Sequence, residues 1–113
     1  MSTLSGDTLR GHLETMVLAV LQRREAHGYE ILRRLEEAGC GALRLKEGTL
    51  YPALYRLERD GLVEAAWERD VQRRGPRRRI YCLTPKGKRQ LKGRRLAWKE
   101  FVSVIGRIVE APA

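Results

Sequence analysis

The spacing of apolar residues changes at Gly61, and this change limits the folds that the chain can adopt. Before Gly61, apolar residues recur at steps of three and four, the spacing of one face of a helix. After it, residues 63–67 alternate as in a half-buried strand, and residues 79–83 form a second alternating run. Gly75-Pro76 marks a turn between these runs. The sequence therefore predicts helices followed by a β-hairpin with a long tip.

Three helices are expected before the hairpin, at residues 8–24, 28–38 and 48–60. Asp7 or Thr8 can cap the first helix. Pro52 is expected in the first turn of the third helix, where backbone N–H groups have no intrahelical partner. A long fourth helix is expected from Thr84-Pro85 to about Val109, because threonine is a good cap and proline suits the first helical position. The expected inward residues are Leu9, Leu13, Met16, Val17, Val20, Leu21, Ile31, Leu32, Leu35, Leu50, Leu54, Leu57, Tyr81 and Leu83.

This order of elements is typical of a winged helix-turn-helix, whose third helix enters the major groove of DNA. The predicted fold is mainly α with a small β-hairpin, ending in a long C-terminal dimerisation helix. We expect residues 1–84 to form the DNA-binding domain and residues 85–113 to form the dimerisation helix, the two making one compact unit.

The charge of the chain points to an anionic partner. The formal net charge is +9 over 113 residues, and so positive a chain repels itself unless something negative is nearby. Nucleic acid, an anionic membrane and an acidic protein are the usual partners. No stretch approaches the roughly 18 apolar residues of a membrane span. The polar stretch from Met1 to Arg10 has no signal-peptide pattern, so a cytoplasmic location is expected.

No residue pattern indicates catalysis, a cofactor or a metal site. Cys40 and Cys82 lie far apart, and neither His12 nor His27 pairs with them at metal-ligand spacing. The chain also has no serine–histidine–acid set and no glycine-rich phosphate loop. We therefore expect that the protein is not an enzyme and binds no cofactor.

The outer face of the third helix carries residue types that bind DNA. The leucine stripe sets the inward direction, and hydrogen-bond donors lie opposite or beside it at about 100° per residue. Arginine can bond bidentately to guanine, and threonine or tyrosine can reach phosphates or base edges. From this helix alone, a merely solvated face is an equally good interpretation. The residues of the face are Gly48, Thr49, Pro52, Tyr55, Arg56 and Arg59.

The hairpin tip favours the DNA-binding interpretation. It carries six arginines and one acid, Asp70, and phosphate groups are the natural partners of such a segment. Solubility alone usually comes from charges of mixed sign. The arginines are Arg69, Arg73, Arg74, Arg77, Arg78 and Arg79.

The second half of the last helix is apolar at steps of three and four, as in a coiled-coil seam. An exposed apolar patch of this kind is a liability for a monomer, so we expect a two-fold homodimer built from this helix and the first helix. Two recognition helices would then read a near-palindromic operator. The predicted interface comprises Leu13, Val17, Leu91, Trp98, Phe101, Val102, Ile105 and Ile108.

One other class of function remains open, a basic protein that binds nucleic acid without sequence preference. RNA-binding proteins usually interleave aromatic and basic residues for base stacking, and only 6% of this chain is aromatic. A DNA-packaging protein would bind through charge alone, and the polar face around Tyr55, Arg56 and Arg59 argues against it.

Four stretches resemble the PadR family of bacterial regulators: His27–Ile31, Glu47–Glu58, Gly61–Val63 and Arg79–Gly87. The resemblance implies a homodimeric winged helix-turn-helix that usually represses transcription. It also implies that five residues lie at or near the DNA face and that two more contact phosphates. The five are Thr49, Tyr51, Pro52, Tyr55 and Arg56, and the two are Tyr29 and Lys46. Helical spacing places Tyr51 sideways, so Tyr51 is expected to be partly structural.

The single C-terminal helix resembles the short subgroup of that family. Some short members bind planar, often cationic compounds between their subunits, stacked on a tryptophan of this helix. The resemblance therefore implies that Trp98 can stack on an effector. The alternative is that Trp98 is part of the dimer core, and the helical spacing of the surrounding apolar residues favours this.

Overall fold

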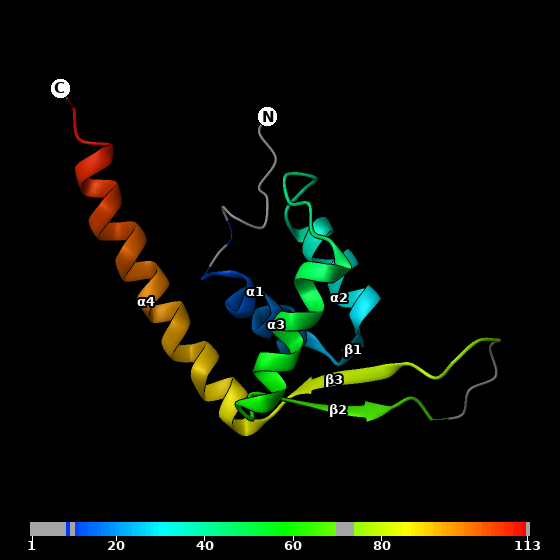
Figure 1. Ribbon diagram of the computed structural model, residues 1–113. Coiled ribbons are helices and arrows are strands. Elements are labelled where there is room, and N and C mark those ends of the chain that lie inside the picture. The colour runs from blue at the N-terminus through cyan, green and yellow to red at the C-terminus, as the bar shows by residue number, and fades with distance from the viewer. Residues whose placement is uncertain (1–8, 10, 70–73, 113) are drawn as a thin grey trace.

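The computed structural model describes residues 9, 11–69 and 74–112. Its elements are α1 (Leu13–Arg23), β1 (Ala26–His27), α2 (Gly28–Ala38), α3 (Glu47–Arg59), β2 (Val63–Trp67), β3 (Arg79–Leu83) and α4 (Pro85–Val109). The first three helices form a body, with the β2–β3 hairpin projecting from one side and α4 from the other (Figure 1). The predicted fold class, mainly α with a small β-hairpin, is confirmed.

The sheet has three strands in the order β1-β3-β2, all antiparallel. The predicted hairpin pairs Val63 with Leu83 at one end and Trp67 with Arg79 at the other. Tyr81 is buried as expected. The sequence analysis missed β1, because two residues are too short to show alternation. This strand joins the start of α2 to the hairpin.

The first helix begins at Leu13, five residues later than predicted. Gly11 has a φ of +86°, in the left-handed region that a right-handed helix cannot contain. Leu9 still reaches the core and is only 6% exposed, so its apolar character reflects burial in the turn before the helix. The predicted caps Asp7 and Thr8 lie outside the described residues.

The core lies where the first three helices meet. Fully buried leucines and isoleucines from α1, α2 and α3 pack together, and the predicted bounds of α2 are confirmed. After α3, Gly61 has a φ of +74° and turns the chain into β2. The central side chains are Val17, Leu18, Ile31, Leu50, Leu54 and Leu57, each at most 1% exposed. Burial of the α3 leucine stripe turns the opposite side of α3 outward.

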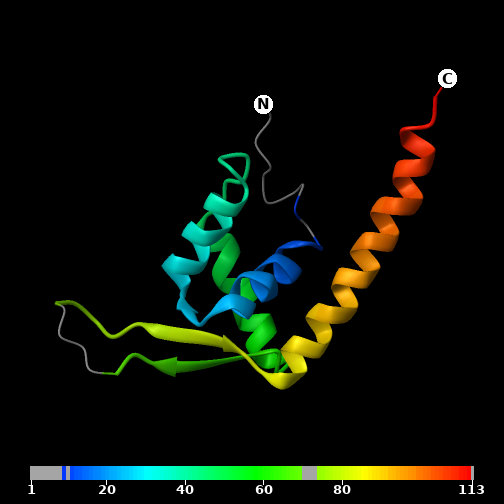
Figure 2. The same cartoon turned by 180° about the vertical axis from the view of Figure 1, so that it is seen from behind.

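Among the described residues, the buried contacts of α4 with the body lie in its first half, at Gly87 and Leu91. Its predicted cap is confirmed, since Thr84 Oγ1 accepts a hydrogen bond from the Gly87 N–H at 3.0 Å. Gly87 packs so closely on Leu62 that a Cβ atom would fall on the Leu62 carbonyl oxygen, and Leu91 is 1% exposed. The later turns stand away from the other helices (Figure 2). Among the described residues, no helix has the length and apolar character needed to cross a bilayer.

Candidate nucleic-acid interface

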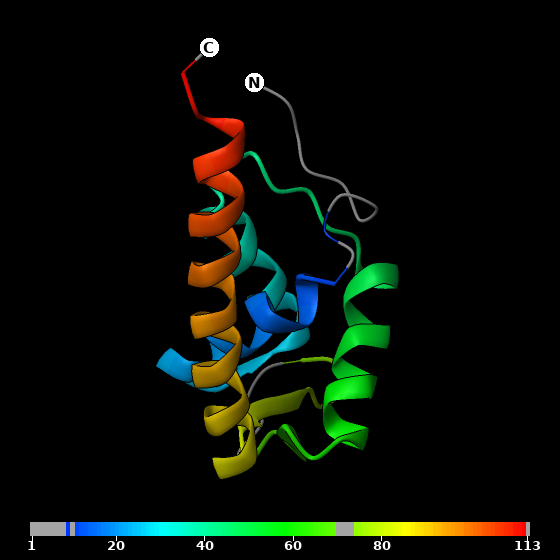
Figure 3. The ribbon, with the colours of Figure 1, turned by 90° about the vertical axis from the view of Figure 1, so that its left-hand side faces the viewer.

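The face of α3 opposite its leucine stripe is open to solvent. Tyr55 is 67% exposed, and Gly48, Pro52 and Arg59 are also exposed. Figure 3 shows α3 at one edge of the molecule, across α1 from α4. No described segment covers this face, so it is free to enter a groove of DNA.

Tyr51 lies at the side of α3 and contacts the start of α2. A Cβ atom at Gly28 would fall on the Tyr51 hydroxyl, so the tyrosine ring packs over that glycine. The ring is still 43% exposed. Tyr51 therefore helps to hold α3 against α2 while keeping a surface for a ligand, which agrees with the sideways position expected from the spacing.

The sequence analysis expected Pro52 in the first turn of α3, and this prediction is wrong. The helix begins at Glu47, so Pro52 is its sixth residue and removes the N–H that would bond to the Gly48 carbonyl. Both residues are exposed, and water can therefore reach that carbonyl. Lys46 occupies the N-cap position and is exposed, and Thr49 is half-buried.

The two arginines on α3 are already paired with acids. Arg56 Nε lies 2.6 Å from Glu14 Oε1 of α1, and Arg59 Nε lies 3.1 Å from Asp60 Oδ1. The hydrogen bond from Arg59 holds the pKa of Asp60 below its ordinary value. All four side chains are partly exposed, and exposed ion pairs are weak. DNA phosphates or bases can therefore compete for both guanidinium groups.

The start of α2 is held by His27, which forms a reciprocal capping box with Glu30. His27 Nδ1 accepts a hydrogen bond from the Glu30 N–H at 3.2 Å, and the Arg78 guanidinium approaches His27 Nε2 at 2.8 Å. Tyr29 stacks beside the imidazole ring at 6.5 Å and is 56% exposed. His27 therefore links the start of α2 to the hairpin and places Tyr29 at the surface.

The hairpin presents exposed arginines, and those that the structure describes are Arg69, Arg74, Arg77, Arg78 and Arg79. Arg73 lies outside the described residues. Arg79 has a structural role, because its Nη2 lies 2.9 Å from Glu58 Oε2 of α3 and its guanidinium lies 5.9 Å from the Trp67 and Tyr81 rings. This ion pair ties the hairpin to α3.

Aromatic and basic side chains meet in a hollow of about 460 Å³ between α2, α3 and the hairpin. Burial raises the pKa of Tyr81. Arginines beside stacked aromatic rings suit the phosphates and sugars of a nucleic-acid strand. The hollow is lined by His27, Gly28, Tyr29, Tyr51, Trp67, Arg77, Arg78, Arg79 and Tyr81.

The sequence analysis did not identify His27, Trp67 or Tyr81 as part of this surface. Trp67 was expected only as part of an alternating strand, and it lies at the end of β2 and is 60% exposed. The signal for His27 was its position three residues before Glu30, the spacing of a capping box.

The predicted dimer residues fall into two groups. Leu13, Val17 and Leu91 are at most 8% exposed within one chain, so they have almost no surface to offer to a partner, and the prediction for these three needs correction. The other five remain open. Trp98 stacks on Phe101 with ring centroids 5.9 Å apart, and both are about half exposed. Val102, Ile105 and Ile108 are 47%, 42% and 70% exposed.

Within the described ranges, no group of three or more histidine, cysteine or acidic side chains could hold a metal ion. The residues described above present hydrogen-bond donors, aromatic rings and positive charges.

A sequence model of the transcriptional regulator PadR-like family matches residues 17–93. The match includes α2, α3, the hairpin and the anchored half of α4. It contains most of the residues described above for the exposed α3 face and the aromatic hollow.

Two relatives extend this likeness. A transcriptional regulator from Mycobacterium tuberculosis is 41% identical over 77 residues, which is 68% of this chain and 66% of the relative. A protein of unassigned function from Lysinibacillus sphaericus is 32% identical over 104 residues, which is 92% of this chain and 94% of the relative.

Solved structures of transcriptional regulators share the fold over nearly the whole chain. A regulator from Clostridium thermocellum has a TM-score of 0.83 at 30% identity, covering 95% of this chain and 99% of its own. A PadR family regulator from Clostridium difficile has a TM-score of 0.77 at 30% identity, covering 88% and 99%. These likenesses are to regulators of transcription, not to enzymes.

Proposed function

The chain belongs to the PadR-like family of transcriptional regulators, and from this premise we propose that it acts as a homodimer that reads a near-palindromic operator and represses transcription there. It is a DNA-binding regulator, and the observation that most supports α3 as its reading element is the uncovered polar face opposite the leucine stripe, with Tyr55 67% exposed. The hairpin arginines and the aromatic hollow lie beside α3. A helix face that is merely solvated does not require such neighbours, so they favour DNA binding.

In the proposed complex, α3 lies in the major groove. Tyr55, Arg59 and Arg56 meet base edges or the adjoining phosphates, and the start of α3 around Lys46 and Thr49 faces the backbone. The hairpin arginines, including Arg74, Arg77 and Arg78 as well as the predicted Arg73, grip the flanking strand. The hollow beside Tyr29 and Tyr51 receives part of that strand.

Dimerisation is proposed through the second half of α4. Five apolar side chains at steps of three and four, from Trp98 to Ile108, are 42–70% exposed in one chain. Pairing of two such helices around a two-fold axis would cover them and set two α3 helices about one DNA turn apart. A dimer bound over a promoter would exclude polymerase, and this is the basis on which we propose repression.

Competition binding tests the sequence preference. A duplex selected by the protein from a random pool should outcompete a scrambled duplex and single-stranded RNA of equal length. Equal affinity for all three would favour the alternative, a basic protein that binds nucleic acid through charge alone. Repression is tested with a reporter gene whose promoter contains the selected duplex. Expression of the reporter should rise when the protein is absent.

A charge-matched pair of variants tests whether α3 reads bases. Arg59→Ala should relax preference at one operator position, a loss of about 1–3 kcal/mol of discrimination. Arg33→Ala is the control, because Arg33 is an exposed arginine of α2 that pairs with Glu37 as Arg59 pairs with Asp60. If both variants keep the wild-type preference, Arg59 does not contribute to base readout.

Trp98 has two proposed roles that one titration separates. In the favoured role it is dimer core, stacked on Phe101 with His12 edge-on at 5.5 Å. In the alternative role it stacks on a planar cationic effector. Quenching of tryptophan fluorescence by such a compound, together with release of DNA, would favour the effector role.

A further inference from the structure

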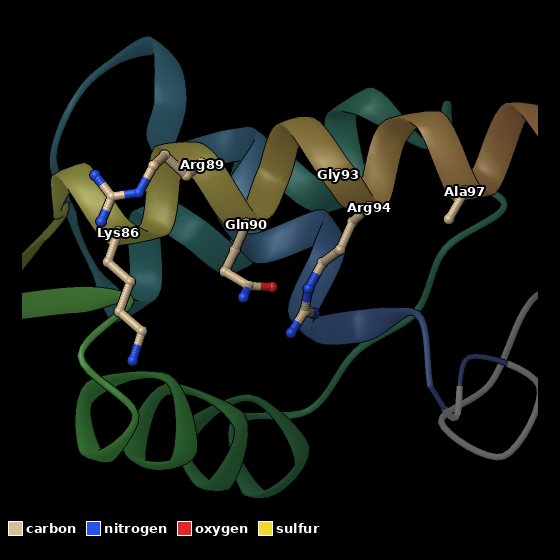
Figure 4. Close-up of a pocket in the computed structure, with 6 residues that line it drawn as sticks. All are labelled: Lys86, Arg89, Gln90, Gly93, Arg94 and Ala97. Carbon is tan, nitrogen blue, oxygen red and sulfur yellow. The ribbon is translucent and has the colours of Figure 1, made fainter.

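A second basic surface lies on the other side of α3, away from the aromatic hollow. The first half of α4 borders a hollow of about 510 Å³, lined by Lys86, Arg89, Gln90, Gly93, Arg94 and Ala97. Lys86, Gln90 and Arg94 extend from α4 toward α3 and α1 (Figure 4). We call this surface the α4 hollow.

Within the part of the chain that the structure describes, no carboxylate pairs directly with the three cations of the α4 hollow. Lys86 Nζ donates to the backbone carbonyl of Asp60 at 2.9 Å, and Arg94 Nη1 donates to the hydroxyl of Thr15 at 3.2 Å. Both acceptors are neutral. Among the described residues, Arg89 makes no hydrogen bond or ion pair, and it is exposed.

Two acids close to the contacts of Lys86 and Arg94 are already paired with arginines of α3. Asp60 pairs with Arg59, and Glu14 pairs with Arg56. The hydrogen bond from Arg59 lowers the pKa of Asp60 most, and the charges of Lys86 and Arg94 lower it further. The charges of Lys86 and Arg94 are therefore both close enough to act on the Asp60 carboxylate. Because that carboxylate is paired with Arg59, the α4 hollow keeps a surplus of positive charge.

We propose that the α4 hollow binds the phosphate backbone of the DNA on which α3 is docked. The proposal rests on the proposed function, because it requires that α3 lies against DNA. Lys86 contacts the residue that follows α3, so a strand passing the Arg59 end of α3 comes within reach of the α4 hollow. Its cations run from Lys86 to Arg94, about 12 Å along the helix. A strand carries a phosphate about every 3.4 Å along the duplex axis, so an extended polyanion fits this row better than a single small anion does.

The salt dependence of DNA binding tests the proposal. The probe is a mixed-sequence duplex of about 30 base pairs, which is long enough for a dimer whose two α3 helices lie one DNA turn apart. Arg89→Gln should weaken binding several-fold and lower the slope of log Kd against log salt by about one unit per lost phosphate contact. Lys86→Gln combined with Arg89→Gln should lower the slope further. Thermal unfolding and sedimentation check that each variant keeps its fold and its assembly state.

Arg95→Gln is the matched control. Arg95 is an exposed arginine of the same helix, about 120° round the axis from Arg89 and away from the α4 hollow. It should keep the wild-type slope. Equal slopes for wild type, Arg89→Gln and the double variant would overturn the proposal, and so would an equal loss in Arg95→Gln, which would mean that only net charge matters.

A second readout separates this inference from the proposed function. The variants of the α4 hollow should weaken binding to selected and scrambled duplexes by the same factor, because backbone contacts carry no sequence information. A loss confined to the selected duplex would overturn backbone binding by this surface. Absence of any preference in the wild-type protein would instead contradict the proposed function, and the slope comparison would still decide the inference.

Discussion

The two halves of α4 share one helix face, because Leu91, Trp98 and Ile105 recur every seven residues, but that face has different surroundings in each half. In the first half, Gly87 and Leu91 are buried against the body, whereas Trp98 and Ile105 are 52% and 42% exposed. The helix is longer than the body that it packs on (Figure 1). The comparison teaches that one periodic pattern can serve two contacts, one within the chain and one that the chain leaves open.

The largest expected effect tests the anchored half. Leu91→Ala should lower the free energy of unfolding by about 2–5 kcal/mol, because it leaves a cavity where α4 meets the core. Leu96→Ala is the matched control, since Leu96 is a leucine of the same helix that is 61% exposed, and it should change stability by less than about 0.5 kcal/mol. Denaturant titration measures both. A small effect at Leu91 would mean that the two halves do not differ.

The next effect tests the open half. Ile105→Asp should weaken dimerisation about a hundredfold, because a carboxylate would be buried without a partner in the proposed interface. The monomer should stay folded. Ser103→Asp adds the same charge about 160° round the helix and should leave the dimer intact. Sedimentation across a range of protein concentrations compares the two variants. A dimer that survives Ile105→Asp would place the interface elsewhere.

The smallest effect locates the boundary between the halves. Arg94→Gln should destabilise the fold by about 0.5–1.5 kcal/mol, because it removes the hydrogen bond to Thr15 of α1. Arg95→Gln should be neutral, since Arg95 is exposed and has no partner among the described residues. Thermal unfolding of both variants measures the difference. Equal melting temperatures would mean that α4 leaves the body before Arg94.

Local patterns were sufficient to predict most elements. The α3 leucine stripe, the Thr84-Pro85 start of α4 and the bounds of α2, β2 and β3 follow from periodicity and capping, which depend on neighbouring residues. The exposed face of α3 was also predictable, because the leucine stripe fixes the buried side of the helix and the opposite side must then face solvent. The start of α1 was wrong, since a turn at Gly11 leaves little trace in the apolar spacing. The first-turn position of Pro52 was wrong as well, because Pro52 is already the fifth residue of the predicted helix and the sixth of the observed one.

The sequence by itself determined whether a side chain is buried or exposed where this depends only on spacing within one helix or strand, as for Leu50, Leu54 and Tyr55. Tertiary structure alone decided which apolar residues of α1 and α4 are core and which are open: Val17 and Leu91 are buried, while Ile105 is not. It also brought His27, Tyr51 and Trp67 into one hollow. The physical reason is that periodicity records only that a face avoids water, whereas the packing of distant segments decides what covers it.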